Sequence, residues 1–509
     1  MTNQPIELLV TNTVTYIRGK LDKGMYQLFK KHLGYKTDDA IFRIKSMSEN
    51  SWASKWDGTI STVCFNKTWC RCAVKRDGTH FPTGLLSLAR EFFDANGIVY
   101  KRIDKRNIVE KTLQLEMSDS FEIRDYQIDI IDKAISQQRG VIKMATGSGK
   151  TAVASKLIQE LQISPFIFYV PSIDLLQQSH DELSKFIKSS GSNLEVGIIG
   201  NMKCDIKDIN IMTIQTAVRA LGEKYVKFDK DEETSKDKTI SKINENDKKN
   251  IKDLIMSAKG IIIDECQHVA CESCQVISDY SESAKYRYGF SATPFRDKGD
   301  DILIDACFGK IIVDINASFL IDRGYLVPPT IYFVKVDNMR GTAFPTYESA
   351  YKIAIVENGL RNSYISNIAN SMKSQGKVIL ILCRHIAHGK MLNDMIEGSE
   401  FLHGAWTGKQ RKYHLDKMRS REASITIATQ IFDEGIDCRP LDTLILAGSG
   451  ISQTRALQRV GRTLRPYDGK NDAVIIDFED NCKYMLKHSR KRKKIYQTEP
   501  SFNIKYLDI

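Results

Sequence analysis

Residues 140–161, GVIKMATGSGKTAVASKLIQEL, decide the fold of this chain. GVIKM reads as a buried strand and TAVASKLIQEL as a helix, with the glycine-rich loop 145–151 between them. A strand that turns through glycines into a helix presents free backbone N–H groups, which bind phosphate oxygens. Met144 stands where the general pattern of such loops has its first glycine, but the strand, loop and helix follow in order. The stretch therefore predicts an α/β domain built around a nucleotide site.

Four side chains have predicted roles in nucleotide chemistry. Lys150 is placed to meet the outer phosphates, and the hydroxyl of Thr151 is placed to hold Mg²⁺. Hydrolysis also needs a carboxylate for the metal and a second one that orients water. Asp264 and Glu265 follow an apolar strand at the carboxyl edge of the expected sheet, where ligands of such sheets bind. The pattern therefore predicts a nucleotide hydrolase.

Short β-branched runs alternate with amphipathic stretches from about Phe121 onward, and continuous apolar strands of this kind are typical of a parallel sheet covered on both faces. The first set of predicted strands is 140–144, 165–170, 209–214, 260–265 and 286–292. The pattern restarts after 323–329, where two prolines end any helix. The second set is 377–383, 423–429, 442–448 and 472–478. The sequence thus predicts two α/β domains, 116–325 and 326–509.

The first 115 residues differ from the rest. Aromatic residues and glycine-containing turns stand between short strands, and helices are expected near 23–32 and 84–96. We interpret this region as a small α+β domain over 1–115.

Residues 223–253 form a charged insertion with 9 basic and 9 acidic residues and very few apolar ones. Such a segment is not expected to bury a face, so the prediction is a mobile loop or a solvated helix.

The net charge of +11 is concentrated at the two ends. Residues 1–115 hold 19 Lys and Arg against 11 Asp and Glu, and residues 483–494 add 7 basic residues and no acid. Basic ends favour a polyanion partner, although a solvated basic surface is an equal alternative. The tail 488–497 is expected to continue a helix after 458–466 with its basic residues outward. Both DNA contact and a solvated face stay open for it.

The eleven cysteines are expected to be reduced, buried thiols without disulfides, because they are scattered and no signal peptide precedes them. Two clusters contain possible zinc ligands but lack the two well-spaced ligand pairs of a tetrahedral site: Cys64, Cys70 and Cys72 with His80, and Cys266, Cys271 and Cys274 with His268. No apolar run approaches the length that spans a bilayer. The expected location is the cytoplasm, without membrane contact.

The motifs taken together resemble the superfamily 2 helicases, in the order of that family. The matching stretches are RDYQ (124–127) for the adenine-reading motif, ATGSGKT (145–151) for motif I, VPSIDLLQQ (170–178) for motif Ia, TIQT (213–216) for a strand-contacting motif, DECQ (264–267) for motif II, SATP (291–294) for motif III, ATQIFDEGID (428–437) for motif V and QRVGRTLRP (458–466) for motif VI. The resemblance implies two RecA-like parallel-sheet motor domains, preceded by the small α+β domain, that use ATP and Mg²⁺.

The resemblance also implies a role for each site residue. The implied catalytic residues are Lys150, Asp264, Glu265, Gln267, Arg462 and Arg465. The implied nucleotide contacts are Arg124, Gln127, Thr146, Gly147, Ser148, Gly149, Lys150, Thr151, Gly435 and Asp437, with Thr151 and Asp264 on Mg²⁺. The implied DNA contacts are Pro171, Thr213, Gln215 and Thr429, and the implied coupling residues are Ser291, Thr293 and Gln458.

Two details of these motifs affect the mechanism. Arg462 and Arg465 are three residues apart, so we expect them on one helix face, where they reach the γ-phosphate only when the two domains close. Motif II of the family usually ends in His, whereas this chain has Gln267 there and His268 one residue later. Gln can still form a hydrogen bond, so the departure bears on coupling to DNA and not on hydrolysis.

The stretches 55–61 and 80–93 resemble those of the phage UvsW-type recombination helicases, whose small N-terminal domain engages duplex DNA. This implies an ATP-dependent DNA helicase for forked DNA and recombination intermediates, moving 3′ to 5′ in the cytoplasm, which is that of the host if the chain is phage-encoded. Trp56 and Phe81 either touch DNA or pack the small domain. The motor motifs leave open an RNA helicase, a double-strand translocase of the restriction-motor type, and a binding clamp with a regulatory, non-translocating ATPase.

Overall fold

The computed structural model of the 509-residue chain describes residues 5–19, 21–34, 79–119, 121–189, 195–223, 244–267, 271–294, 301–404, 406, 408–429, 438–448 and 453–507. It divides into two compact units, Met1–Met144 with Gly149–Asp314 and Ala145–Ser148 with Ile315–Ile509. Each unit contains a large sheet of mainly parallel strands between helices, so the predicted α/β fold class is confirmed. The predicted domain limits at 115/116 and 325/326 stay a prediction.

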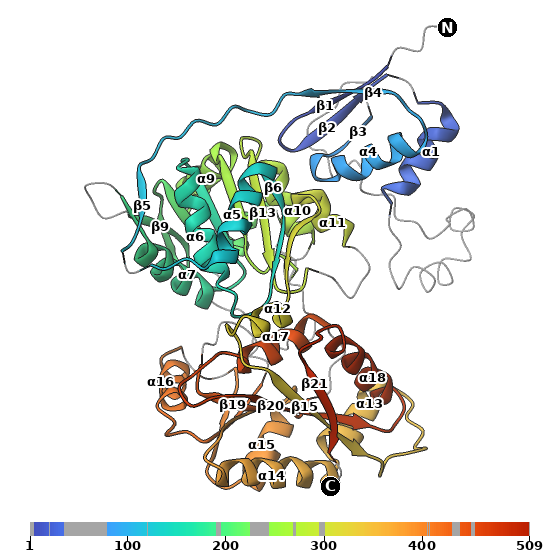
Figure 1. The fold of residues 1–509 in the computed structure, drawn as a ribbon, viewed down its shortest axis with the longest axis vertical. Helices are drawn as coiled ribbons and strands as arrows, with labels where there is room; N and C mark the ends of the chain where they lie inside the picture. The colour runs from blue at the N-terminus through green and yellow to red at the C-terminus, as the bar shows by residue number, and fades with distance from the viewer. Residues whose placement is uncertain are drawn as a thin grey trace. The chain divides into compact units, whose positions relative to one another are not determined.

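The N-terminal part of unit 1 is a small α+β domain, drawn in blue in Figure 1. Its sheet has the order β3-β2-β1-β4, with β1 (Ile6–Val10), β2 (Val14–Arg18), β3 (Thr79–Pro82) and β4 (Tyr100–Asp104). The helices α1 (Lys23–His32) and α4 (Leu86–Ala95) lie near both predicted positions, and a 3₁₀ turn, η2 (Thr83–Leu85), precedes α4. Phe29 forms the centre of the core, with its ring 5.1 Å from that of Phe93 and 5.8 Å from that of Phe81.

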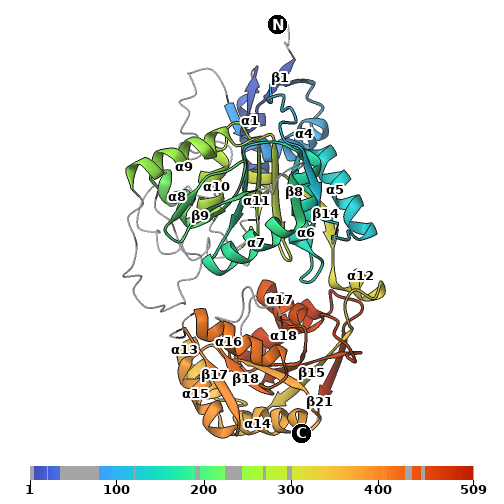
Figure 2. The same cartoon turned by 90° about the vertical axis from the view of Figure 1, so that its left-hand side faces the viewer.

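The large sheet of unit 1 has the strand order β10-β9-β11-β7-β12-β13-β6-β14. The strands are β6 (Arg139–Met144), β7 (Phe166–Val170), β9 (Val196–Gly200), β10 (Lys203–Asp205), β11 (Ile209–Thr213), β12 (Gly260–Ile263), β13 (Tyr286–Ser291) and β14 (Ile311–Ile315). Every residue of β7, β11 and β12 is buried, as expected for strands covered on both faces. Figure 2 shows helices on both sides of these strands.

The helices of unit 1 that pack on this sheet are α5 (Asp125–Gln137), α6 (Lys150–Leu161), α7 (Ile173–Phe186), α8 (Ile214–Ala220), α9 (Glu245–Ser257), α10 (Cys271–Tyr280) and α11 (Ile302–Phe308). A short antiparallel pair, β5 (Leu115–Met117) with β8 (Ile187–Ser189), completes the described strands of the unit.

The last part of the charged insertion is helical. Residues 224–243 lie outside the described residues, but its last part begins helix α9, which Asn244 caps by accepting a hydrogen bond from the backbone N–H of Asp247 at 2.7 Å. Ile251 is buried, together with Leu254 and Ile255 in the next turn. Leu254 and Ile255 lie beyond residue 253, and among residues 245–253 of α9 Ile251 alone is buried, so this part of the insertion is a largely solvated helix, one of the two predicted alternatives.

The small domain and the large sheet of unit 1 share one hydrophobic core, which continues from Phe81 and Phe93 to Ile304 and Phe308 of α11. The guanidinium of Arg139, at the start of β6, donates to the backbone oxygens of Asn12, Cys307 and Phe308 at 3.2, 3.0 and 3.1 Å. Those three oxygens belong to both parts, so the small domain is fixed to the first motor sheet.

Unit 2 has a seven-stranded sheet in the order β17-β18-β16-β19-β20-β15-β21. Its strands are β15 (Pro329–Val336), β16 (Val378–Leu382), β17 (Ser399–Leu402), β18 (Ile425–Ala428), β19 (Leu441–Leu446), β20 (Ala473–Asp480) and β21 (Asn503–Leu507). Its helices are α12 (Ala317–Asp322), α13 (Tyr347–Tyr351), the π-helix η3 (Lys352–Val356), α14 (Gly359–Ser374), α15 (Ile386–Met395), α16 (Gly408–Arg419), α17 (Gln453–Thr463) and α18 (Met485–Tyr496). The four strands predicted in this half correspond to β16, β18, β19 and β20.

Candidate nucleotide site and strand-contacting edge

The glycine-rich loop joins β6 to α6, as the sequence predicts. Gly147 and Gly149 have φ angles of +87° and +81°, a left-handed conformation that glycine adopts without a side-chain clash. Lys150 is the first residue of α6, so the backbone N–H groups that follow the loop are those of a helix start. This part of the chain has the local geometry of a phosphate-binding loop.

Gln127 lies against this loop, in the first turn of α5. Its side-chain oxygen accepts a hydrogen bond from the backbone N–H of Arg124 at 3.0 Å, and the residue is buried. A Cβ atom on Gly149 would come within 2.7 Å of Gln127 Nε2. The loop and the predicted adenine-reading motif are therefore in direct contact, which the sequence alone could not show.

The carboxylate of Glu265 receives a hydrogen bond on each of its oxygens. Lys150 Nζ donates to Oε1 at 2.7 Å, and Gln267 Nε2 donates to Oε2 at 2.8 Å. Burial pulls the pKa of Lys150 down, but the charges of Glu265 and Asp264 outweigh burial, so its pKa is raised and the ammonium is retained. Residues from the loop and from motif II thus form one connected polar cluster.

Asp264 follows β12 at the carboxyl edge of the sheet, and its backbone N–H donates to the oxygen of Tyr169 at 2.9 Å. Burial, and then the charge of Glu265, raise the pKa of Asp264 to about 6, against the attraction of Lys150. Glu265 has a φ of +47°, which non-glycine residues rarely adopt and which often marks a functional position. Glu265 therefore combines a strained backbone with a carboxylate whose charge acts on Asp264.

Other predicted residues of unit 1 lie along the same edge. Thr213 ends β11 opposite Val170, the residue before Pro171, so the two predicted strand-contacting motifs are neighbours. The hydroxyl of Thr213 accepts from the backbone N–H of Thr216 at 3.3 Å and caps α8, in whose first turn Gln215 lies.

Of the predicted coupling residues of unit 1, Ser291 ends β13 and Thr293 follows it at this edge. Ser291 Oγ accepts from the backbone N–H of Thr293 at 2.9 Å, and both residues are buried.

In unit 2 the predicted residues are spread over two segments. Gln458 and Arg462 lie on α17, and the backbone N–H of Thr429, after β18, donates to the oxygen of Leu402 at 3.1 Å. Arg465 lies beyond the end of α17 at Thr463, so the expectation that both arginines share one helix face was wrong. The helix ends early because the chain turns into Pro466, which disfavours helix at the residue before it. Gly435 and Asp437 lie outside the described residues.

Sequence reasoning missed Lys470. Its buried ammonium donates to the backbone oxygen of Thr463, the last residue of α17, at 2.6 Å and to that of Leu441, the first residue of β19, at 2.5 Å. It therefore holds the end of the helix that carries Arg462. No local signal marks it, because its partners come from other segments.

The basic tail also differs from its expectation. It forms α18, which is separated from α17 by β20 and does not continue the motif VI helix. Arg492 is buried and donates to both oxygens of the Asp477 carboxylate on β20, with the shortest hydrogen bonds at 2.7 and 2.9 Å. The prediction that all basic residues point outward was wrong for this residue, because a carboxylate on the underlying strand stabilises its charge.

The remaining predicted sites are partly outside the described residues. Phe81 is fully buried in the small domain, whereas Trp56 is not described. Of the two cysteine clusters, Cys266 and Cys274 are buried, and Cys64, Cys70, Cys72 and His268 are not described. Within the described ranges, no group of three metal-ligating side chains gathers. No helix of the described chain is long and apolar enough to cross a membrane.

Comparisons with known proteins agree with these motifs. Residues 120–296 match the family described as type III restriction enzyme, res subunit, and residues 360–467 match the helicase conserved C-terminal domain. The DNA 3′-5′ translocase XPB2 of Sulfurisphaera tokodaii is 23% identical over 428 residues, 77% of this chain and 89% of that protein. The chain is a superfamily 2 helicase.

Two further relatives each match more than three quarters of the chain. The ATP-dependent DNA helicase UvsW of Enterobacteria phage T4 is 21% identical to it over 471 residues, which cover 86% of this chain and 84% of that protein. A solved HsdR fragment of a type I restriction enzyme from Vibrio vulnificus has a TM-score of 0.53 and 19% identity over 76% of this chain and 68% of that one, which shows a shared fold. This helicase is ATP-dependent, acts on DNA and resembles the UvsW type.

Proposed function

We propose that this helicase unwinds or branch-migrates forked DNA and recombination intermediates, moving 3′ to 5′ in the cytoplasm. Both named relatives support DNA as the substrate, and the one described as a DNA 3′-5′ translocase also supports this polarity. The observation that best supports ATP hydrolysis is that the carboxylate of Glu265 accepts hydrogen bonds from both Lys150 and Gln267.

We assign the steps of ATP hydrolysis to residues of this cluster. Lys150 stabilises charge on the outer phosphates, and Glu265 orients the attacking water. Gln127 reads the adenine beside the loop, together with Arg124. Arg462 and Arg465 respond to the γ-phosphate, and Asp437 and Gly435 contact the ribose side. In this scheme ATP closes the two motor domains and hydrolysis opens them.

Mg²⁺ fits the residues present. Thr151 and Asp264 offer oxygen ligands, which this cation prefers. The raised pKa of Asp264, about 6, reflects a carboxylate whose burial is incompletely offset by positive charge, and a divalent cation would supply that charge. When bound, the ion would neutralise phosphate charge during transfer.

The small N-terminal domain is proposed to bind the duplex arm of a junction. The hydrophobic core of this domain is continuous with that of the first motor sheet. A duplex bound by the domain would therefore keep a fixed position relative to that sheet. Lys101, near the start of its edge strand β4, and Lys105, just after the end of that strand, are exposed and can face phosphates. The DNA strand engaged by the motor is proposed to contact Pro171, Thr213, Gln215 and Thr429, with Ser291, Thr293 and Gln458 coupling the two activities.

Strand displacement on forked, four-way and linear substrates tests the function. We expect unwinding of branched DNA with ATP, and none by Lys150→Ala, which should lose ATP turnover while its DNA affinity stays within a few-fold. Lys156→Ala is the matched control, because this lysine of the same helix pairs with Glu160 on its surface. Turnover retained in Lys150→Ala would contradict the site assignment.

The same assay separates the alternatives. Unwinding of RNA duplexes alone would indicate an RNA helicase, and triplex displacement without unwinding would indicate a double-strand translocase. ATP hydrolysis with neither would indicate a regulatory clamp.

For the N-terminal domain, Lys101→Glu with Lys105→Glu should lower the slope of log junction affinity against log salt by about one per lost phosphate contact. An unchanged slope would remove the duplex-binding role.

A further inference from the structure

Aromatic and basic side chains gather at the carboxyl edge of the sheet of unit 2. Tyr347 follows β15 and Tyr484 follows β20, and these two strands are parallel neighbours that end together. Arg384 follows β16 at the same edge. We call Tyr347, Tyr351, Arg384, Tyr484 and His488 the tyrosine patch. The carboxyl edge of a parallel sheet is where its ligands bind.

The rings of the patch contact one another. The ring of Tyr347 lies 6.3 Å from that of Tyr484, 5.4 Å from that of His488 and 6.1 Å from that of Tyr351. Tyr351 is buried, whereas Tyr347 and Tyr484 are half-buried and keep part of each ring at the surface. Tyr351 therefore forms the base of the patch, and the other two tyrosines form its accessible part.

Positive charge accompanies these rings. The guanidinium of Arg384 lies 5.5 Å from the ring centre of Tyr351, and the ammonium of Lys483 lies 5.0 Å from that of Tyr484. Burial, and then the charges of Arg492, Lys487, Lys491 and Arg384, lower the pKa of His488 to about 4. Cations thus converge on the patch from the loop after β16 and from α18.

The backbone at Tyr484 is strained. Its φ of +71° with a ψ of −49° lies in a region that a residue with a Cβ avoids. A glycine would adopt this conformation without the penalty. Strain of this kind persists where the surrounding structure imposes it, and it often accompanies a functional position.

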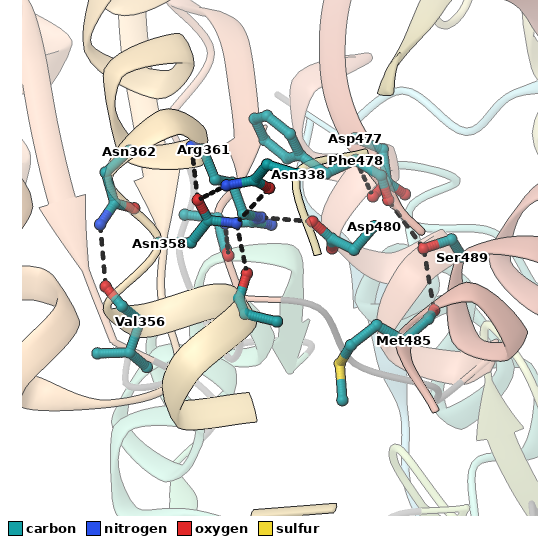
Figure 3. Close-up of polar contacts among 12 residues, drawn as sticks. Asn338, Val356, Asn358, Arg361, Asn362, Asp477, Phe478, Asp480, Met485 and Ser489 are labelled. Atoms are coloured by element: carbon teal, nitrogen blue, oxygen red, sulfur yellow. Dashed lines mark hydrogen bonds and ion pairs between the residues drawn. The ribbon is translucent and has the colours of Figure 1, made fainter. Parts of the chain in front are cut away.

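A buried polar network fixes the two segments that carry the tyrosines (Figure 3). Arg361 donates a hydrogen bond to Asp480 Oδ1 at 2.8 Å, and Asp480 is the last residue of β20, four residues before Tyr484. Asn338 and Asn358 exchange side-chain hydrogen bonds of 2.8 and 3.0 Å at the two ends of the segment that contains Tyr347. Because both segments are anchored in the core, the patch is preorganised and its rings need little ordering on binding.

We propose that the tyrosine patch binds single-stranded DNA, with unpaired bases stacking on Tyr347 and Tyr484 and phosphates next to Lys483 and Arg384. Aromatic faces beside a basic groove are the means by which proteins hold single strands, since every base has a face that stacks. Duplex DNA would not use them, because its bases are already stacked. The proposal rests on the proposed DNA helicase function and adds to it a contact for the strand after separation.

The test uses the full-length protein and a fluorescein-labelled oligothymidylate, with an abasic oligonucleotide of the same length beside it. Fluorescence anisotropy gives both affinities. In Tyr484→Gly we expect the affinity for the oligothymidylate to fall about tenfold, because one stacking contact is lost, while the affinity for the abasic strand stays within about twofold. Its thermal midpoint should be equal to or above that of the wild type, because the strain is relieved.

A second variant, Tyr347→Leu, should give the same difference between the two strands. The matched control is Tyr413→Ala, because Tyr413 is an exposed tyrosine of α16 with Lys417 over its ring but lies outside the patch. Equal affinities of the wild type and both patch variants for the oligothymidylate would overturn the proposal, as would an equal loss for both strands. A wild-type protein that unwinds forks would then keep the proposed function, whereas one that binds no DNA would overturn both.

Discussion

Gln267 donates a hydrogen bond from its side-chain amide to Glu265 Oε2 at 2.8 Å. The other oxygen of this carboxylate is bound by Lys150, so the amide fixes the rotation of a group that is proposed to orient water. The glutamine that replaces the usual histidine of motif II is thereby a direct partner of Glu265, and its effect should extend to hydrolysis itself.

Replacing Gln267 with leucine should lower kcat for ATP by about tenfold with little change in KM, since a hydrogen bond to a charged group contributes about 1.5–3 kcal/mol. Steady-state ATPase kinetics measure both constants. Gln267→His restores a ring donor and should keep most of the turnover. If Gln267→Leu raised KM alone, the amide would act on ATP binding and not on the position of Glu265.

Replacing Lys470 with methionine should lower ATP turnover about as much as Arg462→Ala does, although Lys470 lies beyond the helix. The ammonium holds the carbonyl of Thr463 at 2.6 Å, and without it the end of α17 next to Arg462 is released. Burial lowers the pKa of Lys470 to about 8, so wild-type turnover should also fall as the pH rises through about 8. The variant should lack that decline. Unaltered kinetics and an unaltered pH profile in Lys470→Met would contradict this positioning role.

The stability of unit 2 should fall as the pH drops below about 6.5, the ordinary pKa of histidine. Burial, and then the charges of Arg361 and His385, lower the pKa of His388 to about 3, so between pH 6.5 and 3 the unfolded chain binds a proton that the folded chain does not. From pH 6.5 to 5 this should remove about 2 kcal/mol. Native-state hydrogen exchange of β16, corrected for intrinsic rates, measures the loss, and His388→Gln should flatten it. The same slope in that variant would assign the effect to other groups.

Replacing Gly84 with alanine should destabilise unit 1 by about 1–3 kcal/mol, the usual cost of overpacking. The added Cβ would lie 2.1 Å from the backbone oxygen of Asp305 and 2.4 Å from that of Ala306, and backbone cannot move away as a side chain can. Chemical unfolding measures the change. Gly24→Ala, in the exposed first turn of α1, is the control and should be neutral or stabilising. A stable Gly84→Ala protein would mean that the small domain is not held tightly against α11.

The large sheets were predictable because their signals are local. The fully apolar runs of β7, β11 and β12 and the glycines before Lys150 each specify a conformation from neighbouring residues alone. Boundaries were less certain, and strands such as β9 and β21 were not predicted, since short runs at a sheet edge carry weaker patterns. The order of the motifs along the chain also predicted a nucleotide site at one sheet edge, which stays a prediction.

Only the tertiary structure decided which charges are paired and which are exposed. Arg492 belongs to a basic run that looks solvated in sequence, yet Asp477, on the strand beneath α18, binds it in the core. Lys470 and Thr463, and likewise Tyr347 and Tyr484, become partners for the same reason. The sequence alone determined the local backbone and the class of chemistry, because periodicity and loop composition act over a few residues. The fold decided the pairings, because a buried charge is stabilised by whichever group the packing brings next to it, however distant in the chain.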